Sequence, residues 1–363
     1  MDSGLVDENK RAAFAELVYR TNKLTTIKQT DFALSLNDSG NRSVYGMVFD
    51  KKDGIAYFGG AGLVVGSSEA AIAIGEDMTT GAVSGKFIAG TWIESLAIYE
   101  GKVYASGPNS KTVMKLEDST WDVVDYGVRC VPQSCEGTAY LYVDSKLPWA
   151  GTLLSIEGDD VDSKLKGLYA GGRFDKVGSI TLCGNIGKYD AVNSWQCLDL
   201  GVSKDGETNQ AIVRGLVFMG NVLYVGGAFD KTDSVSVSNL AAWNGEGWNK
   251  LEVEGGGSTA INGDKSMVRA MTADGTSLYL AINDGDDRGT KGEYSGNTDN
   301  TVIEKWTKEE VGGKWKVTKL SCDSELVCDD NFSEKQAIAI TGRVTGMSII
   351  RAVYLIGGEN INN

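Results

Sequence analysis

Apolar and turn residues alternate most regularly in residues 213–251, VRGLVFMGNVLYVGGAFDKTDSVSVSNLAAWNGEGWNKL. Four short apolar runs stand in this stretch, each bounded by turn residues: 215–218, 222–225, 239–243 and 248–251. Met219-Gly220-Asn221 separates the first two runs, which is the spacing of a tight hairpin. Residues 244–247, which include two glycines, separate the last two in the same way. The stretch therefore predicts a small antiparallel sheet of four strands.

The second predicted strand ends in Gly226-Gly227. A strand interior tolerates glycine poorly unless another backbone or a bulky side chain comes close to it. We therefore expect this end of the strand to lie against a neighbouring element. Trp243 and Trp248 are expected to bury against the sheet.

The same unit recurs at intervals of roughly 40–55 residues, which predicts a repeat architecture. Six copies have the approximate bounds 43–91, 92–137, 138–210, 211–266, 267–342 and 343–363. The sixth copy holds only two strands, and residues 15–24 resemble the missing half, so residues 14–36 are expected to complete it. A helix over residues 7–18 is the local alternative, because good helix formers follow early acidic residues there.

These copies predict an all-β fold in one domain, residues 1–363: a six-bladed β-propeller of four-stranded antiparallel blades, closed by strands from both chain ends. A closed ring has no exposed sheet edge, which removes an aggregation hazard. Seven blades are the alternative.

The glycine pairs and tryptophans resemble those of kelch-type propeller repeats. The motif positions are Gly171, Gly172, Tyr189, Trp195, Gly226, Gly227, Trp243 and Trp248. The variant LYxGGxF followed by NLAxWNGxxW is also similar to repeats in the extracellular part of fungal cortical polarity-marker proteins. The resemblance implies a protein-interaction surface. One kelch-type propeller is a copper radical oxidase, but that pattern requires two histidine ligands and this chain has none, so the activity is not expected here.

Charge and composition exclude several classes of function. The net charge of −14 disfavours nucleic acid as a partner, because phosphate binding needs a basic face. The absence of histidine removes the Ser-His-Asp and Cys-His arrangements and the usual acid–base group at neutral pH. No run approaches the roughly 18 apolar residues of a membrane span.

Six cysteines form three locally spaced pairs, Cys130 with Cys135, Cys183 with Cys197, and Cys322 with Cys328. Their even number favours disulfides and an extracellular or cell-surface location, whereas zinc is disfavoured because no CxxC spacing occurs. Sequons for N-glycosylation begin at Asn37, Asn41 and Asn331. The first 20 residues do not read as a signal peptide. The chain is therefore expected to be a processed form, with a cytoplasmic protein as the alternative.

The most ligand-like segment is residues 283–300, where Asp284, Asp286 and Asp287 stand close together. The loop breaks the EF-hand pattern, so it gives weak support for calcium, and no other cofactor or metal is expected. Trp149, which lies outside the repeat register, is the best candidate for an exposed aromatic side chain, although packing against the protein is favoured even there.

The predicted function is a non-enzymatic, secreted or cell-surface module for binding or assembly. Its loops would contact a protein or glycan partner, and self-assembly is a further expectation. The alternatives are a carbohydrate-binding lectin, a carboxylate-dependent glycan hydrolase or lyase, and a subunit of an extracellular filament with strand exchange.

Overall fold

The structure is a computed structural model of the 363-residue chain. It describes residues 34–36, 43–50, 52, 55–65, 68–77, 82–86, 93–107, 113–117, 120–124, 127–129, 149–181, 183–204, 211–233, 235–256, 259–262, 266–284, 300–308, 313–320, 340–341, 343–350 and 353–359. Among these residues no helix is long and apolar enough to cross a membrane.

The sheet predicted in residues 213–251 is present as four antiparallel strands. They are β18 (Ile212–Met219), β19 (Val222–Ala228), β21 (Leu240–Trp243) and β22 (Trp248–Asn249), paired in that order. Gly220 and Asn221 join the first two with φ angles of +59° and +57°. Two successive residues with positive φ give the turn whose twist matches a β-hairpin. The segment between β19 and β21 contains β20 (Lys231–Thr232), which pairs with β17 (Val202–Ser203).

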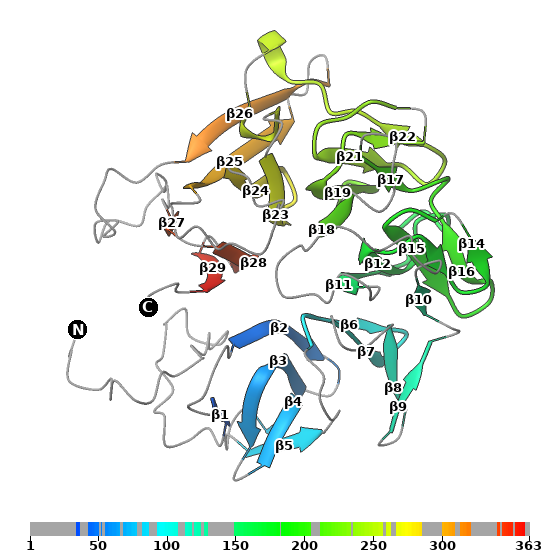
Figure 1. Cartoon of the computed structure of the whole chain (residues 1–363), viewed down its shortest axis with the longest axis vertical. Helices are drawn as coiled ribbons and strands as arrows, with labels where there is room; N and C mark the ends of the chain where they lie inside the picture. Colours follow the sequence, from blue (N-terminus) through cyan, green and yellow to red (C-terminus); the bar gives the residue numbers. More distant parts are fainter. Residues whose placement is uncertain are drawn as a thin grey trace, which may run out of the picture.

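Sheets of the same design precede and follow this one (Figure 1). The first contains β2 (Ser43–Asp50), β3 (Ile55–Val65), β4 (Ser68–Asp77) and β5 (Ala82–Lys86), and the second β6 (Ser95–Tyr99), β7 (Lys102–Ser106), β8 (Met114–Glu117) and β9 (Thr120–Val123). The third contains β11 (Trp149–Ile156), β12 (Gly167–Arg173), β15 (Ile186–Asp190) and β16 (Ser194–Cys197), and the fifth β23 (Ser266–Ala273), β24 (Ser277–Asp284), β25 (Asn300–Lys308) and β26 (Trp315–Leu320). In the sixth, β28 (Arg343–Ile350) pairs with β29 (Val353–Glu359).

Short strands accompany these sheets. β10 (Val128–Arg129), β13 (Lys176–Val177) and β14 (Ile180–Thr181) form a separate small sheet, and β27 (Ile340–Thr341) pairs with β25. β1 (Leu34–Leu36) pairs with β3 of the first sheet. Residues 34–36 therefore lie in the first blade, not in the sixth blade where the sequence placed them. Residues 14–33, predicted to complete the sixth blade, lie outside the described residues.

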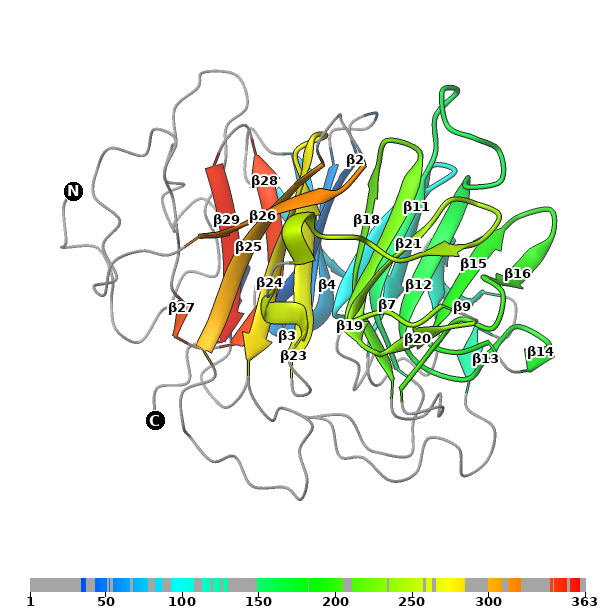
Figure 2. The ribbon, with the colours of Figure 1, turned by 90° about the horizontal axis from the view of Figure 1, so that it is seen from above.

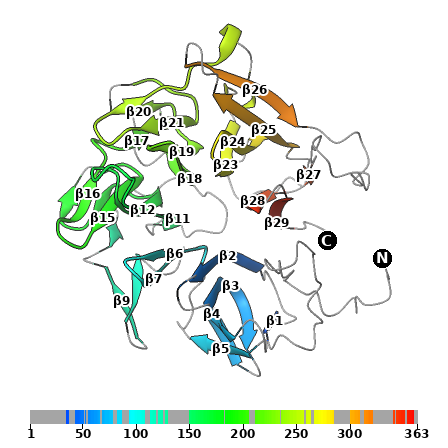
Figure 3. The same ribbon diagram turned by 180° about the vertical axis from the view of Figure 1, so that it is seen from behind.

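The six inner strands form a closed ring. β2 contacts β6, and contacts continue through β11, β18, β23 and β28, which in turn contacts β2. Figures 1 and 3 show the sheets arranged around one axis from opposite sides, and Figure 2 shows inner strands such as β18 and β28 along it. The six-bladed propeller is thus confirmed, and the seven-bladed alternative is wrong.

The glycine pairs mark close approaches within and between blades. A Cβ atom on Gly226 would meet the side chains of Val268 and Met271 on the next blade, whereas one on Gly227 would overlap the Ile212 carbonyl of the same blade. The first glycine therefore allows neighbouring blades to pack closely, and the second lets the inner strand cross near its partner.

Tryptophans of the outer strands link one blade to the preceding one. The Trp195 Nε1–H donates to the Val124 carbonyl at 2.9 Å, and the Trp248 Nε1–H donates to the Leu198 carbonyl at 3.1 Å. Trp248 and its cross-strand neighbour Trp243 are each 7% exposed. Buried indoles usually find such a partner for their N–H group, and here the partner belongs to another blade.

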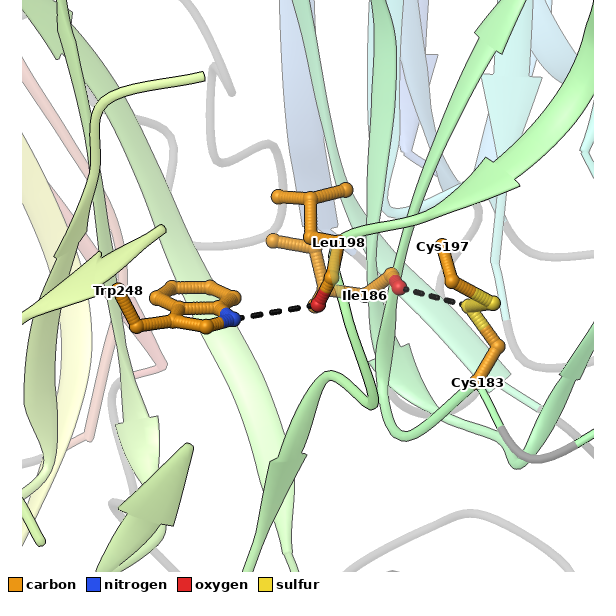
Figure 4. Close-up of a disulfide and its surroundings, with 5 residues drawn as sticks. All are labelled: Cys183, Ile186, Cys197, Leu198 and Trp248. Carbon is orange, nitrogen blue, oxygen red and sulfur yellow. Dashed lines mark hydrogen bonds between the residues drawn. A yellow bond between two sulfur atoms is a disulfide. The ribbon is translucent and has the colours of Figure 1, made fainter. Parts of the chain in front are cut away.

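A disulfide joins Cys183, which precedes β15, to Cys197, the last residue of β16, with Cα atoms 5.4 Å apart (Figure 4). It lies close to Leu198, the residue whose carbonyl accepts from Trp248. This pair was predicted from the sequence. The other four cysteines, at 130, 135, 322 and 328, lie outside the described residues.

Candidate functional site

An irregularity recurs near the start of the inner strands. The pairing register slips by one residue between Val44 and Gly46, Ala150 and Thr152, Val213 and Gly215, Val268 and Ala270, and Val344 and Gly346. The extra residue of a β-bulge is left unpaired, and its side chain is re-aimed. The extra residues are Tyr45, Gly151, Arg214, Arg269 and Thr345. In the second blade Glu94 has the same sequence position, directly before β6. We call these six positions the axial ring, because the inner strands surround the axis.

Gly151 leaves its place in the axial ring open, and Trp149 fills it. A Cβ atom on Gly151 would overlap the six-membered ring of the Trp149 indole. Trp149 is 1% exposed and packs with Ile212, Ala228 and Met267. Ile212 and Met267 occupy the same position in the fourth and fifth blades, two residues before the axial ring. The indole of the third blade therefore stands between its neighbours' axial residues.

Glu94 and Arg214 contact Trp149 from adjacent blades. The Trp149 Nε1–H donates to Glu94 Oε2 at 2.9 Å, and the Arg214 guanidinium carbon lies 4.3 Å from the centre of the indole. The hydrogen bond to an ionised acceptor is among the stronger types, and the cation–π contact contributes about 0.5–2 kcal/mol. Both charged side chains are partly buried. Trp149 therefore fixes a carboxylate and a guanidinium on its two sides.

Arg269 extends this series by one blade. It stands at the axial position of β23, which contacts β18, and its side chain is 2% exposed. Glu94, Trp149, Arg214 and Arg269 come from the second, third, fourth and fifth blades in order, and we call them the axial arc. They carry one negative and two positive charges, a sum of +1, in a chain whose net charge is −14. The arc can take up or release a proton at Glu94 and can stabilise an anion at the arginines.

The acidic loop at residues 157–162 lies at the other end of β11, away from the axial ring. Its acidic residues are exposed: Glu157, Asp159, Asp160 and Asp162. Glu157 accepts from the Glu100 N–H at 2.8 Å, and the Asp162 N–H contacts Asn221 Oδ1 at 3.4 Å. The loop thus bridges the hairpins of the neighbouring blades.

The other predicted site residues do not join the axial arc. Asp284 is the last residue of β24, and Asp286 and Asp287 lie outside the described residues. Asn37, Asn41 and Asn331 also lie outside them. Trp149 is buried, so the exposed aromatic side chain that a lectin would present is not found at this position.

Glu94, Arg214 and Arg269 were not identified as site residues from the sequence. A signal was present, because Ile93-Glu94-Ser95, Val213-Arg214-Gly215 and Val268-Arg269-Ala270 align at the start of the repeat. An apolar residue, a charged residue and a small residue succeed one another in each.

Two buried asparagines were also not identified from the sequence. Asn185 and Asn239 each accept from a backbone N–H, of Phe174 and Phe229, and each donates to a carbonyl of a following segment.

Comparisons with known proteins give similarity of fold only. No family model matches the chain, and no curated protein matches it. Among solved structures, a gluconolactonase from Xanthomonas campestris is 11% identical with a TM-score of 0.43, over 90% of this chain and 86% of that one. A putative 6-phosphogluconolactonase from Bacteroides fragilis is 12% identical with a TM-score of 0.33, over 79% and 90%. A PQQ-bound aldose sugar dehydrogenase from Streptomyces coelicolor is 16% identical with a TM-score of 0.39, over 85% of each chain.

These comparisons correct two expectations. The predicted non-enzymatic module is not supported, because all three solved structures are of proteins named as enzymes of sugar chemistry. The expected absence of a cofactor is not supported either, because one of them is bound to PQQ. No three His, Cys, Asp or Glu side chains gather as metal ligands in the part of the chain that the structure describes. The axial arc, with two guanidiniums beside one carboxylate, also does not suit a cation, and no cofactor is assigned to this chain.

Proposed function

We propose that this protein is a carbohydrate-processing enzyme, a lyase whose acid–base group is the Glu94 carboxylate. One observation carries the proposal: a carboxylate and two guanidiniums occupy the same repeat position, at or just before the start of inner strands around one axis. Catalysis needs a group that moves a proton, and in a chain without histidine a carboxylate takes that role readily.

The charges of the axial arc favour elimination over glycoside hydrolysis. Hydrolases of the common type use two carboxyl groups on either side of the glycosidic bond. In the axial arc Glu94 is the only acidic residue, and its neighbour across Trp149 is the Arg214 guanidinium. Guanidiniums stabilise the negative charge that builds up when a proton leaves a carbon atom.

In the proposed step, Glu94 takes the proton from the sugar carbon next to a carboxyl group. The electron pair of the C–H bond forms a C=C bond as the C–O bond on the adjoining carbon breaks. The leaving oxygen takes a proton from water, and Glu94 returns its proton to solvent. No oxidant or reductant is consumed. Arg214 and Arg269 hold the negative charge of the intermediate, and Trp149 keeps Glu94 in place through its N–H group.

Glu94→Gln tests this assignment because glutamine keeps the size of the side chain and its acceptor oxygen for Trp149. The assay follows the ultraviolet absorbance of the unsaturated product. We expect Glu94→Gln to form this product at least about 100-fold more slowly than the parent protein, because a positioned base typically contributes that much to the rate. Glu157→Gln, at the opposite end of β11, is the matched control and should keep full activity. Equal activity of Glu94→Gln and the parent protein would refute the role of Glu94.

An extracellular or cell-surface location is part of the proposal. The Cys183–Cys197 disulfide supports it, because disulfides persist mainly in oxidising compartments. We also propose that the repeats are of the kelch type and are similar to those of the polarity-marker proteins. The packing of Gly226 and Gly227 and the hydrogen bonds of Trp195 and Trp248 support this. A glycan partner follows from the proposed activity.

Intact mass before and after reduction and deglycosylation tests the location. One or more disulfides and attached glycans on the natural protein are the expected result. A fully reduced, unmodified chain would contradict an extracellular location.

A further inference from the structure

We infer that Ser95 is a positioning residue for Glu94. Its hydroxyl ties the strand that begins directly after Glu94 to the strand that carries Trp149, and so keeps the carboxylate at the indole N–H. The inference rests on the proposed function for the role of Glu94 as the base, and it adds a residue outside the axial arc that holds this base in place.

The hydrogen bond of Ser95 to the next blade is the first reason. The Leu153 N–H donates to Ser95 Oγ at 2.8 Å, and this bond joins β11 of the third blade to β6 of the second. β11 is the edge strand of its sheet, so N–H groups on its outer side need partners from beyond that sheet. Leu153 is 8% exposed, which leaves little access for water. The Ser95 hydroxyl therefore satisfies a buried N–H group and links two inner strands.

The position of this link beside the carboxylate is the second reason. The backbone of Glu94 is fixed within its own blade, because its N–H donates to the Ser106 carbonyl at 2.8 Å. Trp149 begins β11, four residues before Leu153, and its Nε1–H donates to Glu94 Oε2 at 2.9 Å. Glu94 and Ser95, which are adjacent in the chain, thus each receive one hydrogen bond from β11. A shift of β11 along β6 that breaks the bond at Ser95 also moves the indole away from the carboxylate.

The bulge in β11 makes such a link effective. The pairing of β11 with β12 slips between Ala150 and Thr152, which lie between Trp149 and Leu153. A bulge disrupts the ladder locally and bends the strand, so pairing with β12 constrains the start of β11 less closely. The bond from Leu153 to Ser95 follows directly after this bulge and fixes β11 there from the other side.

Comparison of the repeats is the third reason. Ser95 stands one residue after the axial position, where the other blades have Gly46, Thr152, Gly215, Ala270 and Gly346. A Cβ atom on Gly46 would lie 3.4 Å from the Leu96 nitrogen of the next blade. One on Gly215 would lie 3.4 Å from the Met271 nitrogen of the next blade. Leu96, Leu153 and Met271 share one repeat position, so this place faces the same N–H group in each pair of blades. The blade design works with glycine or alanine there, and the serine stands in the blade that carries the carboxylate.

Hydrogen exchange of the Trp149 Nε1–H tests the inference without turnover. The indole signals are followed by NMR, and that of Trp149 is identified by its loss in Trp149→Phe. In Ser95→Ala we expect this N–H to exchange about 10-fold faster than in the parent protein, the effect of weakening one hydrogen bond. The Trp195 Nε1–H, which joins the outer strands of the same two blades through the Val124 carbonyl, should keep its rate.

Two further variants serve as matched controls. Ser95→Thr keeps the hydroxyl, and threonine already occupies the equivalent position as Thr152, so slow exchange at Trp149 should be restored. Ser155→Ala removes another partly buried serine of β11, whose Oγ–H donates to Glu157 Oε2 at 3.2 Å at the opposite end of the strand. It should leave the Trp149 exchange rate unchanged.

Turnover of an oligouronate gives the second readout. Ser95→Ala should lower kcat about 10- to 100-fold with KM nearly unchanged, because a base displaced by about 1 Å loses rate without losing the substrate contacts made elsewhere. Ser95→Thr should recover most of that loss. Ser155→Ala should have the kcat of the parent protein.

Each outcome has a defined meaning. An unchanged rate at Trp149 in Ser95→Ala, or equal increases at Trp149 and Trp195, would overturn the inference. Thermal denaturation shows whether each variant is folded, and if Ser95→Ala is not, Ser95→Gly is measured in its place, since glycine stands there in three other blades. Unfolding of both would show a purely structural role and also overturn the inference. Faster exchange in Ser95→Ala without any turnover by the parent protein would contradict the lyase proposal alone. A slow Glu94→Gln beside a fully active Ser95→Ala would contradict the positioning role alone.

Discussion

Asn239 offers the sharpest test of how the blades are held together. Its side chain accepts from the Phe229 N–H at 3.0 Å and donates to the Ile261 carbonyl at 2.8 Å, and its φ is +60°. Phe229 is fully buried, and Asn239 and Ile261 are each 5% exposed. Asn239→Ala would therefore leave one donor and one acceptor without a partner in a region that excludes water.

The expected loss has two parts. Leaving a buried polar group unsatisfied costs about 1–3 kcal/mol. Taking about 1.5 kcal/mol for each of the two groups gives about 3 kcal/mol in total. Placing alanine at a positive φ costs about 1 kcal/mol more. Asn239→Ala should thus lower the free energy of unfolding by about 4 kcal/mol, measured by urea denaturation with tryptophan fluorescence.

Asn221→Ala is the matched control. Asn221 has nearly the same φ, +57°, but it is exposed and its side chain makes only a 3.4 Å contact. It should lose about 1 kcal/mol, which is the cost of the positive φ alone. Asn185, with φ of +65° and hydrogen bonds of 3.1 and 2.9 Å, repeats the design in the third blade and should match Asn239. Equal losses for Asn221→Ala and Asn239→Ala would refute the reasoning.

Three further predictions concern stability. Gly226→Ala should cost about 1–3 kcal/mol in urea denaturation because its Cβ would meet the next blade, whereas Gly247→Ala, which has open space, should cost almost nothing; similar losses would contradict the packing role. Cys197→Ser should cost about 3 kcal/mol for a loop of 14 residues, and reducing agent should then have no further effect at this pair. Burial raises the pKa of Asp274, but hydrogen bonds led by that from the Thr276 N–H outweigh it and hold the pKa below its ordinary value. The associated stability is present above pH ~4 and is lost as pH falls through the folded-state pKa, so Asp274→Asn should flatten the acid limb of the pH–stability curve, and an unchanged limb would count against this role.

The strands and their repetition could be predicted from the sequence because they depend on local spacing. In residues 213–251 the turn at Gly220-Asn221 and the alternation of apolar runs specify a hairpin within a few residues. Gly226-Gly227 indicated a close approach to another element. In the structure Gly226 lies against Val268 of the next blade, and Gly227 lies against the Ile212 carbonyl of its own blade. The Cys183–Cys197 pair was also accessible, since its two members are close in sequence.

The axial arc could not be predicted because its members are far apart in the chain. From the sequence, Trp149 was the best candidate for an exposed aromatic side chain, because it follows Pro148 outside the repeat register, although packing was favoured even there. Trp149 is buried because Gly151 has no side chain and so leaves room for the indole. The spacing of apolar and polar residues does not predict this packing. Glu94 and Arg214 are 120 positions apart, and each alone resembles any charged residue at the start of a strand.

By itself, then, the order of residues determined which segments become strands, where they turn and that they repeat, because hydrogen bonding and side-chain alternation in a hairpin act over a few neighbours. Tertiary structure decided that five of the inner strands carry a bulge near their start and which charged groups stand at the equivalent positions. That decision needs all six sheets at once, since a side chain faces the axis only after the blades on both sides have packed against its strand.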